Sequence, residues 1–416
     1  MPGDSDHRSS SETHGHSGRS PRSGGLRARE HAAKSHPSQH LTRHDISPVN
    51  TEKDRGIKQR LRFLKATVAL VIWTLPSPGT AYDPLATSAD VLPPAPLSVA
   101  DQKRDRSIPL LVTLPKDSAP APVVLFSHGL GGSRQGCGYL REHWAGRGYV
   151  AVFLQHPGSD ASVWQDVPQR QRLQAMKQAA SMENMQARVD DVAAVLDALN
   201  EWQQQPGHPL AGRLDLDHVG MSGHSFGART TQAVAGQTGW RARAGPDNRI
   251  DAAVIFSPSA PRLRSAEAAF GSVTIPWLLM TGTDDVAPIG GATVASRLAV
   301  FPALPAGGKF ELVLADGTHA AFTDHGGPLQ HDRNPNHHRA IKAISTAFWD
   351  TYLKGDAEAK AWLTGDGPRE ILERAERKKG VRTLFRIRRG GGGWTAGSVV
   401  ARSSEPASYR LRVQRD

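Results

Sequence analysis

The chain has 416 residues, with 51 Lys and Arg against 40 Asp and Glu, and it contains one cysteine. Its excess positive charge lies at the two ends, because residues 1–60 carry a net charge of +4 and residues 368–416 carry +8, which leaves −1 for residues 61–367. A nucleic-acid surface requires positive charge on the folded part of a protein, so this distribution excludes nucleic acid as a partner, and one cysteine excludes an intramolecular disulfide.

The first 57 residues are rich in Ser, His, Gly, Arg and Pro and show almost no apolar periodicity. Such a segment buries too little apolar surface to fold alone. We therefore expect residues 1–57 to be disordered, or to be an extension that lies ahead of the true translation start.

Residues 58–81 have the three parts of a signal peptide. A positively charged segment, residues 58–65, precedes the apolar residues 66–75, and small residues follow up to Ala81. The apolar part is too short to span a bilayer comfortably, which favours a signal peptide over a membrane anchor; a buried strand is the alternative. We expect a secreted or periplasmic protein without a stable membrane span.

From about residue 97 to 353, apolar strand-like runs alternate with helical patterns. Strands are expected at residues 108–114, 123–127, 149–155, 219–221, 252–256, 277–280 and 310–314, and helices at 139–147, 169–204, 226–235, 293–301 and 338–353. Buried parallel strands that alternate with helices are typical of an α/β fold, so we predict a mostly parallel central sheet with helices on both faces. The carboxyl ends of the strands then lie along one edge, where a site is expected.

The segment Gly223-His224-Ser225-Phe226-Gly227 has the form G-x-S-x-G and lies between an apolar run and a helical pattern. A strand, a sharp turn and a helix in this order expose the serine hydroxyl above a sheet, so we predict that Ser225 is a nucleophile. The two glycines are expected because a side chain at either position would clash at the crowded bend. A Gly-Ser turn without a catalytic role is the alternative, since the pattern also arises by chance.

Two further segments supply the groups that activate a serine. An expected strand that ends at Met280 leads into Thr281-Gly282-Thr283-Asp284-Asp285, and the last expected strand leads into a loop with His319. We predict that His319 is the general base and that Asp285 orients it, with Asp284 as the alternative acid. The competing histidines follow in a polar stretch before the final helix: His325, His331, His337 and His338.

Acyl transfer also needs donors for the oxyanion, usually backbone N–H groups. One expected donor is the N–H of Phe226, directly after the serine. The other is the N–H of Leu130, in the glycine-rich residues 127–134 that follow an expected strand. A phosphate-binding loop is the competing interpretation of this segment, but it lacks the G-K-[ST] ending and the G-x-G-x-x-G spacing.

Four segments within residues 97–353 carry a resemblance to a known family: Phe126-Ser127-His128-Gly129-Leu130-Gly131-Gly132-Ser133, Gly148-Tyr149-Val150-Ala151-Val152, His156-Pro157-Gly158-Ser159-Asp160 and Gly223-His224-Ser225-Phe226-Gly227. Together they resemble the α/β-hydrolase superfamily, and within it the serine esterases of the platelet-activating-factor acetylhydrolase and dienelactone-hydrolase-related group. The resemblance implies an α/β-hydrolase fold and the same roles for Ser225, His319, Asp285, Leu130 and Phe226. Dienelactone hydrolases use a cysteine nucleophile where this chain has Ser225, which disfavours their substrate.

The combined expectation is an exported serine hydrolase that cleaves carboxylic esters through an acyl-enzyme, acting on a small-molecule or lipid ester without a metal or cofactor. A polyester- or cutin-type hydrolase is one alternative, and a non-catalytic binding protein on the same fold is another. Beyond residue 368 the pattern fades into an Arg-rich stretch with four consecutive glycines, so we expect residues 368–416 to form a basic, glycine-rich, flexible tail.

Overall fold

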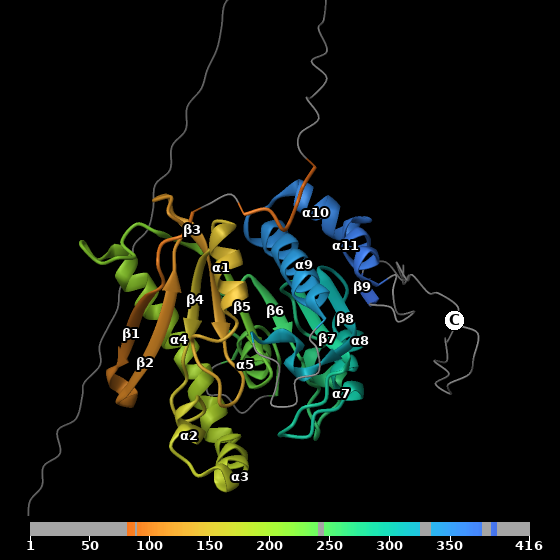
Figure 1. Cartoon of the computed structure of the whole chain (residues 1–416). Helices are drawn as coiled ribbons and strands as arrows, with labels where there is room; N and C mark the ends of the chain where they lie inside the picture. Colours follow the sequence, from red (N-terminus) through yellow and green to blue (C-terminus); the bar gives the residue numbers. More distant parts are fainter. Residues whose placement is uncertain (1–80, 88–89, 240–244, 325–333, 377–383, 389–416) are drawn as a thin grey trace, which may run out of the picture. The chain divides into compact units, whose positions relative to one another are not determined.

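A computed structural model describes residues 81–87, 90–239, 245–324, 334–376 and 384–388 of the chain (Figure 1). All of these residues belong to one compact unit. The expected N-terminal extension, residues 1–57, and all of the expected signal peptide except Ala81 lie outside the described residues.

The described residues form a nine-stranded sheet with the strand order β1-β2-β4-β3-β5-β6-β7-β8-β9 (Figure 1). Neighbouring strands from β4 to β8 run parallel, and the pairs β1–β2, β2–β4 and β8–β9 are antiparallel. The mostly parallel α/β sheet predicted from the sequence is therefore confirmed. The strands are β1 (Ala95–Asp101), β2 (Arg106–Thr113), β3 (Ala121–Ser127), β4 (Val150–Leu154), β5 (Leu214–His224), β6 (Ala252–Phe256), β7 (Trp277–Asp284), β8 (Lys309–Thr318) and β9 (Leu384–Arg388).

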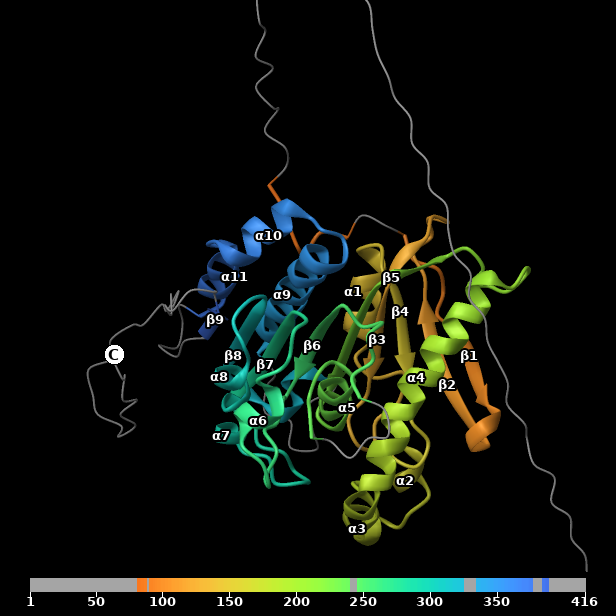
Figure 2. The same ribbon diagram turned by 180° about the vertical axis from the view of Figure 1, so that it is seen from behind.

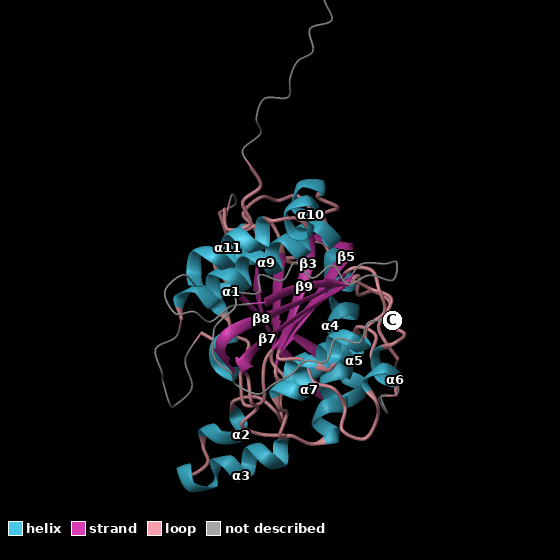
Figure 3. Ribbon diagram, turned by 90° about the vertical axis from the view of Figure 1, so that its right-hand side faces the viewer, coloured by secondary structure: helices cyan, strands magenta, loops and turns pink. Residues whose placement is uncertain are grey.

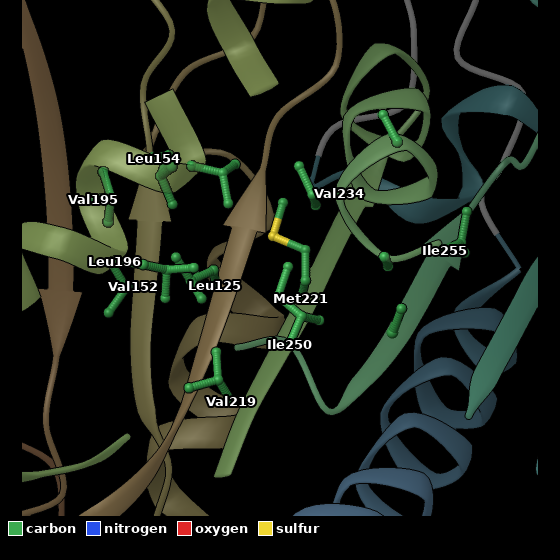
Figure 4. Close-up of a cluster of buried hydrophobic side chains, with 14 of the residues drawn as sticks. Leu125, Val152, Leu154, Val195, Leu196, Val219, Met221, Val234, Ile250 and Ile255 are labelled. Carbon is green, nitrogen blue, oxygen red and sulfur yellow. The ribbon is translucent and has the colours of Figure 1, made fainter. Parts of the chain in front are cut away.

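Alternating side chains of the central strands divide the core into two layers. In β3, Val123 and Leu125 belong to one buried cluster, whereas Val124 and Phe126 belong to the other. This alternation follows from the two-residue repeat of a strand, and both faces are apolar because helices cover both. Figure 4 shows the first cluster, in which Leu125 lies among side chains of neighbouring strands and of helices α4 and α5.

Helices cover each face of the sheet (Figures 2 and 3). One face carries α1 (Gly138–Gly146) and α9 (Pro335–Leu353), with α10 (Ala357–Thr364) and α11 (Gly367–Glu376) against α9. The other carries α4 (Met182–Gln204), α5 (Phe226–Val234), α6 (Ala266–Phe270), α7 (Val294–Leu298) and α8 (Val300–Ala303). Two further helices, α2 (Ser162–Gln165) and α3 (Gln169–Ala179), lie between β4 and α4 in the sequence. Among the described helices, none has the length and the hydrophobicity that a membrane crossing requires.

The helical region expected at residues 169–204 is two helices, α3 and α4. Ser181 has an extended conformation and its side chain accepts a hydrogen bond from the backbone N–H of Asn184, which begins α4 at Met182. A serine that captures an N–H in this way starts a new helix because it satisfies one of the donors left free at the first turn. Because of this break, α3 and α4 are separate helices and need not share one axis.

The segment from residue 368 differs from the flexible tail that the sequence predicts. Residues 368–376 belong to α11, and β9 pairs with β8 at the edge of the sheet. The strand is held because the Arg386 guanidinium forms an ion pair with the buried Glu311 carboxylate and Ile387 packs against the core. The remainder of the expected tail, residues 377–383 and 389–416, lies outside the described residues.

Candidate active site

Ser225 lies at the sharp turn between β5 and α5. Its backbone has φ 59° and ψ −110°, which only a tightly held non-glycine residue adopts. The backbone N–H of Ser225 donates to the carbonyl of Phe256 in the neighbouring strand β6 at 3.0 Å, so the sheet itself holds the turn. As predicted for this motif, a strand precedes the serine and a helix follows it.

The two flanking glycines are required by the close approach of β3. A Cβ atom on Gly227 would lie 1.9 Å from the carbonyl oxygen of Ser127, and one on Gly223 would lie 2.5 Å from the carbonyl oxygen of Gly227. Real Cβ atoms do not approach backbone atoms so closely. The clash predicted for a side chain at either position is therefore confirmed.

Three side chains form a continuous chain of hydrogen bonds above the sheet. Ser225 Oγ lies 2.8 Å from His319 Nε2, and His319 Nδ1 lies 2.7 Å from Asp285 Oδ1. A carboxylate can only accept, so Nδ1 carries the proton and Nε2 is the acceptor for the serine hydroxyl. The structure thus brings together three residues that are distant in the sequence. Ser225 and His319 are 94 positions apart, and His319 and Asp285 are 34 positions apart.

Asp285 follows β7 and is fully buried. Its second carboxylate oxygen accepts a hydrogen bond from Thr281 Oγ1 at 2.9 Å, and Arg297 Nε lies 3.0 Å from Oδ1. Burial alone raises the pKa of Asp285, but the hydrogen bond and charge of His319 and the positive charge of Arg297 outweigh it, so the pKa is lowered. Asp284 is exposed, and the carboxylate that lies 2.7 Å from His319 Nδ1 is that of Asp285, so Asp284 does not occupy the acid position.

His319 directly follows β8, at the same edge of the sheet as Ser225 and Asp285. His224 donates through Nε2 to the carbonyl oxygen of His319 at 3.0 Å, and burial followed by the nearby His319 lowers the pKa of His224 to about 3. A neutral His224 therefore supports the backbone of His319. Of the competing histidines, His337 bonds to the Ala315 carbonyl and His338 stacks on Tyr139, whereas His325 and His331 lie outside the described residues.

Leu130 and Phe226 both line the cavity in which Ser225 lies. Phe226 is the first residue of α5, where a backbone N–H has no partner within the helix. Leu130 lies in the loop after β3, and a Cβ atom on the preceding Gly129 would lie 3.5 Å from the Ser225 Cβ. No hydrogen bond from either N–H to another described residue is present, so neither donor is committed elsewhere in the described part of the chain.

The cavity above this edge has a volume of about 1370 Å³. Ser225 and His319 form part of its wall, together with the apolar side chains of Leu130, Trp164 and Met176. Trp164 is fixed by a hydrogen bond from its Nε1 to the Gly131 carbonyl at 2.8 Å. The serine hydroxyl is therefore accessible to a ligand of considerable size with an apolar part.

Sequence reasoning missed Arg297, which positions the acid. Its guanidinium is buried, donates to the backbone carbonyls of Asp285 and Ser257 at 2.7 Å each, and lies beside the Asp285 carboxylate. The Nη2 of Arg297 also approaches His319 Nδ1 to 3.1 Å, but Nδ1 already donates to Asp285 and cannot accept. No local signal identifies Arg297, because it lies on α7 among residues of ordinary helical character.

A donor set for a metal ion is absent from the described residues, which contain no group of three or more His, Cys, Asp or Glu side chains with suitable placement. Comparison of the sequence with protein-family models and with curated proteins finds no match. The geometry is that of a serine hydroxyl, an imidazole and a buried carboxylate joined by hydrogen bonds at the wall of a cavity. Such an arrangement can form and hydrolyse an acyl-serine.

Proposed function

We propose that this protein is an exported serine hydrolase with an α/β-hydrolase fold, which cleaves carboxylic esters through an acyl-enzyme. The observation that carries the proposal is the hydrogen-bonded chain from Ser225 through His319 to Asp285 at the wall of a large cavity. Binding proteins on such a fold need no complete chain of this kind, which favours the enzyme over the non-catalytic alternative.

The arrangement of the site on the sheet supports the fold assignment. In α/β-hydrolases the serine lies between a strand and a helix, and the acid and the histidine follow later in the chain. Here Ser225, Asp285 and His319 follow β5, β7 and β8 in that order, at one edge of the sheet. One oxyanion donor follows the serine and the other lies after β3, as this fold requires.

In the acylation step, His319 Nε2 removes the proton from Ser225 Oγ while the oxygen attacks the ester carbonyl carbon. The Asp285 carboxylate stabilises the imidazolium that forms and keeps its Nδ1 proton in place. The backbone N–H groups of Leu130 and Phe226 donate to the negatively charged oxygen of the tetrahedral intermediate. His319 then returns its proton to the departing alcohol, which leaves an acyl group on Ser225.

In the deacylation step, the same histidine activates a water molecule. His319 Nε2 takes a proton from the water, whose oxygen attacks the acyl carbonyl and forms a second tetrahedral intermediate. Collapse of this intermediate releases the carboxylic acid and returns the proton to Ser225. Apart from the ester and this water molecule, the groups that take part in both steps are residues of this chain.

The lining of the cavity supports an ester with an apolar chain as substrate. Leu130, Trp164 and Met176 can contact such a chain, and three arginines that also line the cavity can neutralise an anionic group of a lipid ester: Arg229, Arg262 and Arg264. These features support a soluble small-molecule or lipid ester as the substrate.

Labelling with a fluorophosphonate and hydrolysis of p-nitrophenyl esters of increasing acyl length test the proposal. We expect a single adduct on Ser225 and turnover of short to medium chains, and we expect the Ser225→Ala variant to lose both. Insoluble polyester serves as the comparison substrate, since faster release from the polymer than from soluble esters would identify a polyester hydrolase. A folded wild-type protein without adduct and without turnover would be a binding protein instead.

A further inference from the structure

A second chain of Ser, His and Asp side chains lies inside the protein. Ser127 Oγ lies 2.9 Å from His156 Nε2, and His156 Nδ1 lies 2.9 Å from Asp191 Oδ2. All three residues have no exposed surface. A hydroxyl, an imidazole and a carboxylate are joined here in the same order as in Ser225, His319 and Asp285, although the two sets of residues come from different elements.

This buried chain is not a second catalytic site. None of its three residues lines the cavity of about 1370 Å³, so no substrate reaches the Ser127 hydroxyl. Burial, followed by the positive charge of Arg188, lowers the pKa of His156 to about 4, so the ring stays neutral and its Nδ1 proton is donated to Asp191. The Ser127 hydroxyl donates to His156 and its oxygen remains free to accept.

Arg188 of α4 donates a hydrogen bond to the hydroxyl oxygen of Ser127. Arg188 Nη1 lies 3.2 Å from Ser127 Oγ and donates to the carbonyl oxygen of His128 at 2.7 Å, while Nε donates to Ser159 Oγ at 2.8 Å. Arg188 is fully buried, and no carboxylate of the described residues forms an ion pair with it. Its guanidinium is instead held by neutral groups, with its carbon 4.7 Å from the centre of the Phe226 ring.

Two of the residues that Arg188 contacts, Ser127 and His128, lie where β3 passes into the loop that carries the Leu130 N–H. His128 Nε2 accepts the backbone N–H of His156 at 3.1 Å, so the ring proton lies on Nδ1 and is donated to the carbonyl oxygen of Gly129 at 2.6 Å. Burial and then the charge of Arg188 lower the pKa of His128 well below its usual value, which keeps this single-proton form. The Gly129 carbonyl also accepts from the N–H of Gly132 at 3.0 Å.

The Gly129 carbonyl and the Leu130 N–H belong to one planar trans peptide and point in opposite directions. Holding the carbonyl therefore fixes the direction of the N–H. The next residue is held as well, because Gly131 donates to the Ser159 carbonyl at 2.9 Å, and Arg188 bonds to the hydroxyl of the same Ser159. Loss of Arg188 would release both the His128 carbonyl and Ser159.

We propose that Arg188 is a positioning residue for the oxyanion donor Leu130, and that the buried chain Ser127–His156–Asp191 holds its guanidinium in place. This inference rests on the proposed ester hydrolysis. Its physical basis is that an oxyanion donor contributes only when its direction is fixed before the reaction. A buried cation beside the loop also favours negative charge there, because little water screens it.

The test compares Arg188→Met, Arg188→Lys and Ser127→Ala with the wild type. For Arg188→Met we expect kcat on p-nitrophenyl butyrate to fall about 100-fold, as for the loss of one oxyanion donor, with KM changed less than about threefold. The affinity for an alkyl trifluoromethyl ketone, whose adduct with the serine carries an oxyanion, should fall by the same factor as kcat/KM. For Arg188→Lys and Ser127→Ala we expect kcat and the affinity for the ketone each to fall about 10-fold, again with a small change in KM.

Arg147→Met is the matched control. Arg147 is also mostly buried, but it pairs with Asp350 near the carboxyl ends of α1 and α9. The variant should lower the melting temperature while kcat and ketone affinity stay within about twofold. Should Arg188→Met fail to fold, Ser127→Ala decides. If the wild type is active and the folded Arg188 or Ser127 variants keep its kcat and ketone affinity, the inference is overturned and the proposed function stands. If the wild type is inactive and unlabelled, the proposed function is overturned and this inference with it.

Discussion

At the scale of single residues, buried charged groups determine the geometry of the candidate site. Arg297 and His319 both contact the Asp285 carboxylate, and Arg188 holds the loop that carries Leu130. The buried guanidinium groups of Arg297 and Arg188 and the buried Asp285 carboxylate are costly to remove from water, and each is retained where it directs a neighbouring group. The geometry of the site therefore depends on buried supporting side chains as well as on Ser225 and His319 at the cavity wall.

The Asp285→Asn variant tests the role of the acid. An asparagine can donate its amide hydrogen to His319 Nδ1, which moves the ring proton to Nε2 and removes the acceptor for the Ser225 hydroxyl. We expect kcat on a p-nitrophenyl ester to fall by about 10³- to 10⁴-fold with the fold retained. Steady-state kinetics, with circular dichroism to verify folding, measures this effect.

Asp284→Asn is the control for this substitution, since Asp284 is the adjacent residue and is exposed. It should leave kcat within about twofold of the wild type, as expected for a surface change. A large loss of kcat in Asp284→Asn together with an active Asp285→Asn would reverse the assignment of the acid.

At the scale of elements, the contact between α5 and the end of β3 sets the position of the serine. The backbone of Gly227 lies so close to Ser127 that no side chain fits between them. Since α5 begins at Phe226 and the loop with Leu130 follows Ser127, this closeness brings both segments to the wall of the cavity that Ser225 also lines. The glycine is thus needed for the spacing between two elements as well as for the turn.

The Gly227→Ala variant tests this spacing. Its Cβ would lie 1.9 Å from the Ser127 carbonyl oxygen, so α5 must move away from β3. We expect a loss of about 3 kcal/mol in the free energy of unfolding and a fall in kcat that exceeds the loss of folded protein. Urea unfolding and kinetics on the same samples measure both.

Gly245→Ala is the matched control, because a Cβ at Gly245 meets no atom of the described residues within 4 Å and its φ is not in the left-handed region. This variant should keep the stability and kcat of the wild type within experimental scatter. Equal behaviour of the two glycine variants would show that the approach of α5 to β3 is not needed.

At the scale of the whole molecule, β9 closes the edge of the sheet through a buried ion pair. Glu311 of β8 is fully buried, and its Oε2 accepts from Arg386 Nε at 2.6 Å. Burial raises the pKa of Glu311 from 4.5 to about 7, although the charge and hydrogen bond of Arg386 act in the opposite direction. The strand that the sequence placed in a flexible tail therefore covers an ionisable group of the core.

The raised pKa predicts a pH dependence of stability. The folded state holds the Glu311 proton more tightly than the unfolded state, so the stabilisation is complete below pH 4.5 and is lost as the pH rises to about 7. The loss reaches about 3 kcal/mol by pH 8, since one pKa unit corresponds to about 1.4 kcal/mol. The difference in unfolding free energy between the wild type and Glu311→Gln should change by this amount between pH 4.5 and 8.

Glu201→Gln is the control for this measurement, because Glu201 is exposed on α4 and its substitution should leave the pH profile parallel to that of the wild type. Parallel profiles for Glu311→Gln as well would contradict a raised pKa for the buried carboxyl. Urea unfolding at fixed ionic strength across this pH range provides the comparison.

Much of the fold and of the candidate site could be predicted from local patterns. The strand runs ending at Ser127 and Met280, the turn at Ser225 and the loop with His319 each depend on short-range periodicity or on glycine spacing, which are visible in a one-dimensional sequence. The strand at residues 384–388 could not be predicted, because an edge strand is stabilised by its partner and by contacts such as that between Arg386 and Glu311.

The sequence by itself determined the alternation of strands and helices in the central part of the chain, the strained serine turn and the chain order of Ser225, Asp285 and His319, because these follow from side-chain repeats and backbone sterics within a few residues. Only the tertiary structure decided that Asp285 rather than Asp284 meets His319, that Arg297 holds this acid and that Arg188 holds the loop with Leu130. Those choices depend on distances between residues that are far apart in the chain, and distances of that kind arise only when the sheet brings the carboxyl ends of its strands together.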